Sequence, residues 1–282
     1  MPQTNLLASM AVCLVSAKRL NPVLLLLFSL AWSSVASAST WYVNGVSGSD
    51  SNSCTSPTNA CRTIKHSISL AASGDSIIVA PAIYTENLLT IGNSLKVIGS
   101  GANTTIVDGG GTNTVIKISN TGAQVTISKL TIRKGAANFG GGVYNLGMLT
   151  LSHVIITANR ASRTCNNGCS AGGGGIYNLG TLTISNSTIT LNSVQVTGCT
   201  QTVTFCGAFA RGGGISSATG TFAINNTTIS GNTTDSKCRV PAPMQRAVRR
   251  RTVREYGAAI ILRCKAAFTA KTQIALASRR LF

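Results

Sequence analysis

Short segments in the middle of the chain alternate apolar residues with small polar ones, which is the pattern of a half-buried β-strand. The clearest such segment is residues 181–185, and related segments begin at Val125, Leu149 and Phe222. Aligned on Leu182, the four copies recur after 24, 33 and 40 residues. Segments this short cannot bury their apolar sides alone, so the repetition predicts that they stack as the rungs of a solenoid.

The stacking of such rungs predicts an all-β fold, a single-stranded right-handed parallel β-helix, with a continuous column of Val, Ile and Leu inside. In this column Ile184 should point inward, above Leu151 or its neighbour and below Ile224. Thr183 should face outward, because successive side chains of a strand point to opposite sides.

Glycine triplets precede the last three copies, and each is followed by Ile or Val. They are Gly140, Gly141 and Gly142; Gly173, Gly174 and Gly175; and Gly212, Gly213 and Gly214. Such triplets indicate sharp bends or places where the backbone packs too closely for a Cβ. The alternative, a phosphate-binding loop, would need a Gly-x-x-x-x-Gly-Lys-Ser/Thr motif, which the sequence lacks.

Asparagines recur at equivalent places in the copies. Asn145 and Asn178 follow equivalent tyrosines, whereas Asn159, Asn192 and Asn232 end equivalent strands. Amides stacked from rung to rung would hydrogen-bond along the solenoid and tie down the turns. We therefore interpret these asparagines as structural residues and not as a recognition surface.

The combination of Gly-Gly-Gly-Ile/Val with a later Ile-x-x-Asn resembles the paired repeats of polymorphic outer-membrane proteins and related bacterial surface β-helix proteins. The resemblance covers roughly residues 140–232. It departs from the family pattern at Ile156, Ile189 and Ile229, where the family more often has Phe. The resemblance implies a pectin-lyase-like fold and a location that is secreted or at the cell surface, either extracellular or in the outer membrane.

Residues 1–38 have the organisation of an export signal. Lys18 and Arg19 supply the positive flank, residues 23–32 the apolar core, and residues 36–38 a small-residue cleavage site. The alternative is a buried hydrophobic helix. A membrane span needs about 20 apolar residues, so we predict no transmembrane span once the signal is cleaved.

Residues 39–112 are predicted to form an N-terminal cap and the first irregular coils. Residues 41–45 predict a strand, and residues 62–72 a short helix with Ile64, Ile68 and Ala71 on one side. This order resembles the amino-terminal part of secreted pectin-lyase-like proteins, in which a small helix covers the open end of the solenoid. Regular β-helix repeats should then occupy residues 113–236.

Six cysteines of the predicted solenoid form three pairs that are close in sequence. They are Cys54 and Cys61, Cys165 and Cys169, and Cys199 and Cys206. We predict three local disulfides, at loop positions outside the strand column, as expected in an oxidising compartment. Zinc is the alternative, but the pairs have no Cys-x-x-Cys spacing, and His66 and His153 lie well away in sequence.

The net charge of +18 comes from 24 basic and 6 acidic residues and is unevenly distributed. Residues 237–282 hold 12 basic residues and one acid, whereas residues 39–236 hold 10 and 5. The repeat region has no basic stripe with interleaved aromatic residues, so we predict no nucleic-acid partner. Residues 237–282 are predicted to be an irregular basic tail outside the solenoid, either for anionic polymers or as the frame-shifted or truncated end of a longer repeat protein.

Candidate catalytic groups are few. The predicted solenoid has only five carboxylates, and none lies between Asp108 and Asp235; the others are Asp50, Asp75 and Glu86. A glycosidase needs a carboxylate pair and a calcium-assisted lyase a carboxylate cluster, so we predict no catalytic residue, cofactor or metal. The expected role is structural, display or adhesive, with extracellular or cell-surface polysaccharide or protein as partner.

The alternative function is a carbohydrate-active enzyme, a polysaccharide lyase or glycosidase, with its site in the coils before residue 125. Two or more carboxylates converging in a groove near Asp75, Glu86 and Asp108 would favour the enzyme. A smooth face rich in Thr and Asn would favour adhesion or display.

Overall fold

The computed structural model describes residues 37–165, 168–198 and 208–238. The predicted signal peptide and the predicted basic tail lie outside these residues, apart from residues 37–38 and 237–238. The pair Cys199 and Cys206 also lies outside them. No helix in the described ranges has the length and apolar character needed to cross a membrane.

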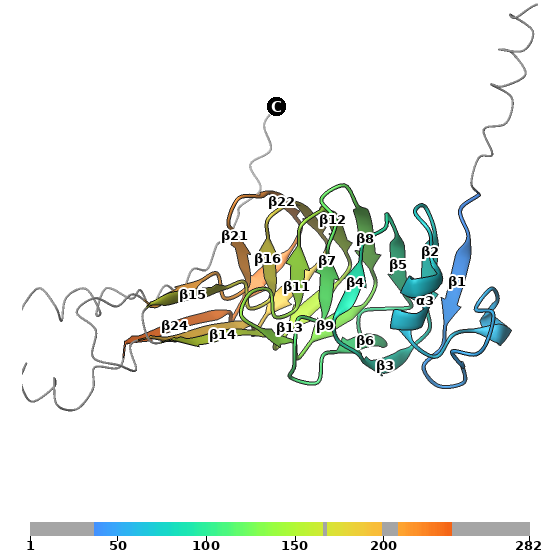
Figure 1. Ribbon diagram of the computed structural model, residues 1–282, viewed down its shortest axis with the longest axis horizontal. Helices are drawn as coiled ribbons and strands as arrows, with labels where there is room; N and C mark the ends of the chain where they lie inside the picture. The colour runs from blue at the N-terminus through green and yellow to red at the C-terminus, as the bar shows by residue number, and fades with distance from the viewer. Residues whose placement is uncertain (1–36, 166–167, 199–207, 239–282) are drawn as a thin grey trace, which may run out of the picture. The chain divides into compact units, whose positions relative to one another are not determined.

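Three parallel sheets form the solenoid, and each turn of the chain from Ser76 to Ser217 adds one strand to each sheet in the order A, B, C (Figure 1). Sheet A contains β1 (Thr40–Val43), β2 (Ser76–Val79), β5 (Lys96–Gly99), β8 (Gln124–Ser128), β12 (Met148–Ser152), β17 (Thr181–Ser185) and β22 (Thr221–Asn225). Sheet B contains β3 (Ala82–Thr85), β6 (Thr105–Asp108), β9 (Thr131–Arg133), β13 (Ile155–Thr157), β18 (Thr188–Thr190) and β23 (Thr228–Ser230). Sheet C contains β4 (Leu89–Ile91), β7 (Ile116–Ile118), β11 (Val143–Asn145), β16 (Ile176–Asn178) and β21 (Ile215–Ser217). The last described turn adds β22 to sheet A and β23 to sheet B. The predicted fold class, an all-β parallel β-helix with a short N-terminal helix, is confirmed.

The register of sheet A follows the sequence repeat residue for residue. Val125 pairs with Leu149, Leu149 with Leu182, and Leu182 with Phe222. The periods of 24, 33 and 40 residues therefore all return the chain to the same place on the rung. The longer periods are accommodated between sheets B and C, where the chain leaves the solenoid and comes back.

The apolar column has the predicted orientation. Ile184 is fully buried and lies in register between Leu151 and Ile224, whereas Thr183 is partly exposed. Phe222, at the last rung of sheet A, is 58% exposed although its partner Leu182 is fully buried.

The predicted capping helix is α3 (Ile64–Leu70), which lies between β1 and β2 along the chain and packs against both and against β4 (Figure 1). Ile64 and Ala71 are buried, and Ile68 packs against the core from its edge. Thr63 caps the helix by accepting a hydrogen bond from the His66 backbone N–H. A 3₁₀ turn, η1 (Pro57–Asn59), precedes α3 in the loop closed by the first disulfide.

The extra residues of the longer rungs form two further parallel sheets. Sheet D contains β10 (Ala136–Ala137), β14 (Arg160–Cys165), β19 (Ser193–Gly198) and β24 (Thr233–Cys238), and sheet E contains β15 (Cys169–Gly172) and β20 (Ala208–Arg211). They share a small second core of four buried side chains: Ala161, Ala171, Val194 and Val196. Sheet D thus continues to Cys238, past the predicted end of the repeats at residue 236.

Two of the predicted disulfides are present, Cys54–Cys61 and Cys165–Cys169, with Cα separations of 4.9 and 6.2 Å. The predicted placement at loop positions outside the strand column is right for Cys54 and Cys61, which lie in the loop between β1 and α3, and wrong for Cys165 and Cys169, which lie in strands. Cys165 ends β14 and Cys169 begins β15, so this bond joins sheet D to sheet E. Cys54 and Cys61 are fully buried in the main core, because the loop between them folds over the end of the column next to Val43.

Candidate binding face

The glycine triplets are positions at which the chain turns from the inserted segments back into sheet C. The first glycine of each triplet has a left-handed φ, for example 63° at Gly173. At the second, a Cβ on Gly174 would collide with the carbonyl oxygens of Gly213 and Ser193 on adjacent strands. The interpretation of sharp bends and close backbone packing is therefore confirmed.

The repeated asparagines form buried ladders along the solenoid, as predicted. Asn159 Nδ2 donates to Asn192 Oδ1 and Asn192 Nδ2 donates to Asn232 Oδ1, each at 3.0 Å. In a second ladder, Asn145 Nδ2 donates to Asn178 Oδ1 at 2.7 Å. The amides also bond turn backbone, such as the Gly135 N–H that donates to Asn159 Oδ1. Asn145, Asn159, Asn178 and Asn192 are buried and hydrogen-bonded, so these side chains are not available to a ligand.

Asp75 is used to hold β1 and the end of α3 in place. It accepts hydrogen bonds from the Ser39 N–H at 2.7 Å, the Trp41 indole N–H at 2.8 Å and the Ala72 N–H at 2.9 Å. Burial raises the pKa of Asp75, but these three donors outweigh burial and hold the pKa below its ordinary value. The carboxylate is ionised and fully engaged at neutral pH.

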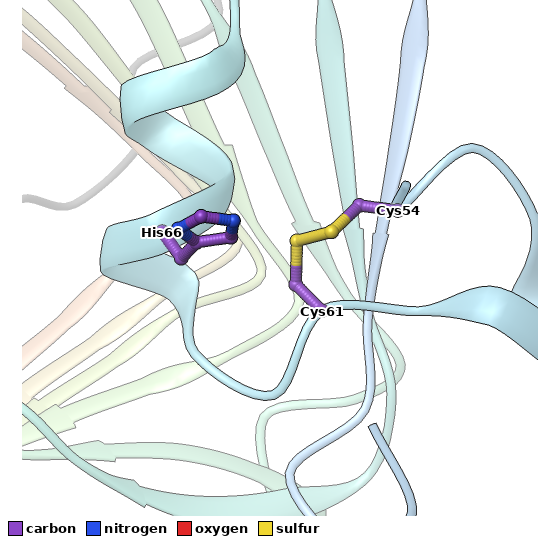
Figure 2. Close-up of side chains that lie close together, drawn as sticks. All are labelled: Cys54, Cys61 and His66. Carbon is purple, nitrogen blue, oxygen red and sulfur yellow. A yellow bond between two sulfur atoms is a disulfide. The ribbon is translucent and has the colours of Figure 1, made fainter. Parts of the chain in front are cut away.

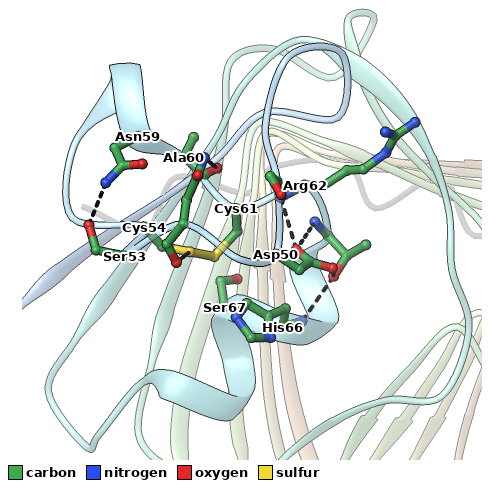
Figure 3. Close-up of a disulfide and its surroundings, with 12 residues drawn as sticks. Asp50, Ser53, Cys54, Asn59, Ala60, Cys61, Arg62, His66 and Ser67 are labelled. Carbon is green, nitrogen blue, oxygen red and sulfur yellow. Dashed lines mark hydrogen bonds between the residues drawn. A yellow bond between two sulfur atoms is a disulfide. The ribbon is translucent and has the colours of Figure 1, made fainter.

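Asp50 and Glu86 both serve the first turn of α3. Asp50 Oδ1 accepts from the Arg62 and Thr63 N–H groups at 2.9 Å (Figure 3). Glu86, from the next coil, accepts from the N–H groups of Ile64 at 2.9 Å and Lys65 at 2.8 Å. These are the orphan donors of a helix N-terminus, where negative charge is favourable.

The two carboxylates at α3 titrate in opposite directions. Burial raises the pKa of Asp50, but hydrogen bonds from Thr63 and Arg62 outweigh it and the pKa is lowered. Burial of Glu86, with a smaller contribution from the nearby Asp50 charge, raises its pKa despite its two backbone donors. A raised carboxyl pKa is a feature of general acids, but here both Glu86 oxygens are occupied by backbone donors.

The remaining described carboxylates form ion pairs. Asp108 lies 2.7 Å from Arg133 Nε and 3.1 Å from Lys134 Nζ, and it accepts from the Gly110 N–H. Asp235 pairs with Lys237 at 3.0 Å on the surface. Asp75, Glu86 and Asp108 therefore share no hydrogen-bonding partner, and each is occupied by its own local donors.

Two arginines lie close together on sheet D, which is outside the three sheets of the main solenoid. A shallow groove of about 310 Å³ on this sheet is lined by Asn138, Arg160, Ser162, Arg163, Thr164, Gln195 and Thr197. We call this the arginine groove. Arg160 donates to the Gln195 side-chain oxygen. None of the ion pairs between described residues involves Arg160 or Arg163. The groove is therefore lined by two arginines among hydroxyls and amides, with Asp235 in register with Gln195 on the next strand.

A row of aromatic side chains lies on the outer face of sheet C, whose strands follow the inserted segments along the chain. Lys117, Tyr144 and Tyr177 occupy one register position on successive strands. The rings of Tyr144 and Tyr177 are 5.6 Å apart, Phe139 lies 4.8 Å from Tyr177, and Lys117 Nζ lies 6.0 Å from the Tyr144 ring. We call Phe139, Tyr144 and Tyr177 the aromatic row. Burial, and then the neighbouring Tyr177, raise the pKa of Tyr144, so the phenol is neutral and can donate a hydrogen bond at pH 7.

The outer face of sheet A has a different character, being rich in hydroxyls. Thr126, Thr150 and Thr183 stack in one row along the sheet. Ser128, Ser152 and Ser185 form the next outward row. The arginine groove and the aromatic row, linked through the consecutive residues Asn138 and Phe139, thus stand out as the chemically distinct part of the solenoid surface.

A third cluster lies at the N-terminal cap. His66, in the first turn of α3, has its ring beside the Cys54–Cys61 disulfide (Figure 2). The two Sγ atoms and a ring nitrogen all lie within 4.8 Å of one another. His66 is therefore close to the cysteines, contrary to the expectation from its place in the sequence, because the loop that closes the disulfide also brings α3 back over it.

The fold and this surface define the protein as a parallel β-solenoid with a cation-rich, partly aromatic side face. Comparison of the chain with models of protein families, with curated proteins and with solved structures found no match. The function of the chain is therefore inferred below from its own residues.

Sequence reasoning missed both parts of the binding face. Tyr144 and Tyr177 mark equivalent positions in the repeat, which is a signal that their rings stack from rung to rung. Arg160 and Arg163 belong to an inserted segment with little periodicity, and only the register of β14 with β19 brings Arg160 to Gln195.

Proposed function

We propose that this protein is a secreted or cell-surface β-helix protein with a structural, display or adhesive role, and that it adheres to extracellular polysaccharide. It would share the pectin-lyase-like fold and the repeat type of polymorphic outer-membrane proteins. The observation that carries the proposal is the side face, on which the arginine groove adjoins the aromatic row.

The chemistry of this face suits a polysaccharide, in particular one that carries carboxylates or sulfates. A guanidinium binds such anions through two parallel hydrogen bonds. Hydroxyl and amide groups in the arginine groove can exchange hydrogen bonds with sugar hydroxyls, and exposed aromatic faces give apolar contact with sugar rings. The row along sheet C follows the solenoid axis, which suits an extended chain.

The distribution and partners of the acidic residues favour binding over catalysis. Three of the described carboxylates bond backbone groups or an indole, and two are paired with cations. The sequence between Asp108 and Asp235 contains no acid. Asp235 is in register with Gln195 of the groove, but it is paired with Lys237. Asp50 and Glu86 approach each other at the first turn of α3, but both accept hydrogen bonds from backbone N–H groups there, which does not favour the carbohydrate-active alternative.

Binding of the full-length protein to immobilised acidic and neutral polysaccharides tests the proposal. We expect binding to an acidic polysaccharide that weakens with salt. The double variants Arg160→Ala/Arg163→Ala and Tyr144→Ala/Tyr177→Ala should each lose at least about tenfold in affinity, equivalent to about 1.4 kcal/mol. The matched control, Thr126→Ala/Thr150→Ala on sheet A, should bind like the original chain.

Equal binding by all three variants would show that this face is not the adhesive surface. Tighter binding to single-stranded nucleic acid than to any polysaccharide would overturn the ligand class. Release of new reducing ends from the polysaccharide would instead support the enzyme alternative.

A further inference from the structure

The cluster at the N-terminal cap has the composition of a metal site. Cys54 and Cys61 are fully buried, and His66 is partly exposed with its ring directed at the disulfide (Figure 2). Their three potential ligand atoms lie within 4.8 Å of one another. Two thiolates and an imidazole are ligands that Zn²⁺ prefers.

The backbone that carries the cysteines is held in place by bonds other than the disulfide. The Tyr42 N–H donates to the Cys54 carbonyl and the Cys61 N–H donates to the Tyr42 carbonyl, both at 2.8 Å. The Asn44 N–H donates to the Cys61 carbonyl, also at 2.8 Å. Strand β1 therefore holds the backbone of both cysteines through hydrogen bonds in addition to the S–S bond.

The third ligand is fixed independently. The His66 N–H donates to Thr63 Oγ1 at 3.1 Å, and Thr63 in turn donates to Asp50 through its N–H at 2.9 Å and its hydroxyl at 2.8 Å (Figure 3). Glu86 holds the next N–H groups of the same turn. The first turn of α3 is thus anchored to two coils, and the position of His66 follows from it.

We propose that, when the Cys54–Cys61 bond is reduced, Cys54, Cys61 and His66 bind one Zn²⁺ ion. A dithiol or phosphine reductant supplies two electrons, and two protons from it or from water complete two thiols. Zinc binding then releases the two thiol protons, and a water completes the tetrahedral coordination. The inference is independent of the proposed polysaccharide binding.

The distances allow this with small side-chain movements. Zn–S bonds of about 2.3 Å and Zn–N bonds of about 2.0–2.1 Å at tetrahedral angles place the sulfur atoms about 3.8 Å apart and each about 3.5 Å from the nitrogen. In the oxidised chain the two sulfurs are bonded to each other and lie with a His66 ring nitrogen within 4.8 Å. After reduction, zinc binding requires the two sulfurs to move apart to about 3.8 Å.

The consequence is that the loop over the end of the solenoid is closed in both redox states. In the oxidised state the disulfide closes it, and in the reduced state the metal ion does. The end of the apolar column next to Val43 would thereby stay covered before the disulfide forms.

Zinc protection of individual thiols tests the proposal in the full-length chain, which has nine cysteines. The chain is reduced with a phosphine, incubated with or without Zn²⁺, alkylated and mapped by mass spectrometry. We expect zinc to slow alkylation of both Cys54 and Cys61 at least tenfold. His66→Asn should abolish this protection, whereas the control His153→Asn should retain it.

Co²⁺ substitution gives a second measurement on the same samples. Reduced wild-type chain should bind one more equivalent of Co²⁺, with a thiolate charge-transfer band, than Cys54→Ser/Cys61→Ser. The oxidised chain should show no such extra equivalent. Equal alkylation of Cys54 and Cys61 with and without zinc, or equal protection in His66→Asn and His153→Asn, would overturn the proposal.

Discussion

Placing a charge at Ile184 tests the inward face of the solenoid most directly. Ile184 is fully buried in register between Leu151 and Ile224. Ile184→Asp removes an apolar side chain from the column, and large-to-small changes at such sites cost about 2–5 kcal/mol. It also buries a carboxylate without a partner, for which the effective penalty is several kcal/mol per ion. Because whole domains are stable by only about 5–15 kcal/mol, the variant should be largely unfolded around this rung at neutral pH.

Thr183→Asp is the matched control, one residue away on the same strand. Thr183 is partly exposed and is flanked in register by Thr150 and Ala223. No acidic residue lies beside it on either neighbouring strand, so the free energy of unfolding should change by no more than about 0.5 kcal/mol. The two variants carry the same added charge and differ only in the side of the sheet.

The assay is unfolding in urea at pH 7, followed by circular dichroism. The urea midpoints of the two variants are compared, and no free energy is extrapolated to water. Solenoids unfold rung by rung, so a single two-state free energy is not well defined for them. Ile184→Asp should regain part of its stability near pH 4, because a buried carboxyl is more easily protonated than an exposed one. Similar midpoints for Ile184→Asp and Thr183→Asp would refute the assigned inward face.

Two further predictions concern polar groups. Asn192→Ala removes a side chain that donates to the Ile156 and Thr190 carbonyls and hydrogen-bonds both neighbouring ladder amides. Each buried partner left without a hydrogen bond should cost about 1–3 kcal/mol. The urea midpoint of this variant should therefore fall well below that of Thr183→Ala. Acidification below pH 3.8, the ordinary pKa of an aspartate side chain, should destabilise the cap. The pKa of Asp75 is lower than this in the folded state, so the stability that Asp75 contributes is lost as the pH falls through its folded-state pKa. Glu86 has a raised folded-state pKa, so it should add slight stability as the pH falls toward 4.5, the ordinary pKa of a glutamate side chain. Unfolding followed by tryptophan fluorescence in the original chain and in Asp75→Asn separates the contribution of Asp75 from that of Glu86.

The architecture was predictable because it depends on local periodicity. Apolar and polar residues alternate from residue 181 to 185, and this pattern recurs in the other copies, which determines both the strand and its register. The observed pairing of Leu149 with Leu182, and of Leu182 with Phe222, follows the alignment of the copies. The asparagine ladders were predictable for the same reason, since equivalent positions on stacked rungs must lie above one another. A regular solenoid turns a one-dimensional pattern directly into contacts.

The features that could not be predicted from the sequence lie where the chain departs from the regular repeat. Residues 160–172 carry too few apolar side chains to indicate sheets D and E, and their small core of Ala161 and Ala171 has no sequence signature. His66 is a clearer case: in sequence it follows Cys61 without a metal-binding spacing, yet α3 returns over the disulfide because Asp50 and Glu86, from two different coils, both anchor its first turn. Those backbone bonds leave no trace in the spacing of residues. Functional clusters in a solenoid are therefore to be sought at its cap and its insertions, where residues from separate rungs meet outside the repeat.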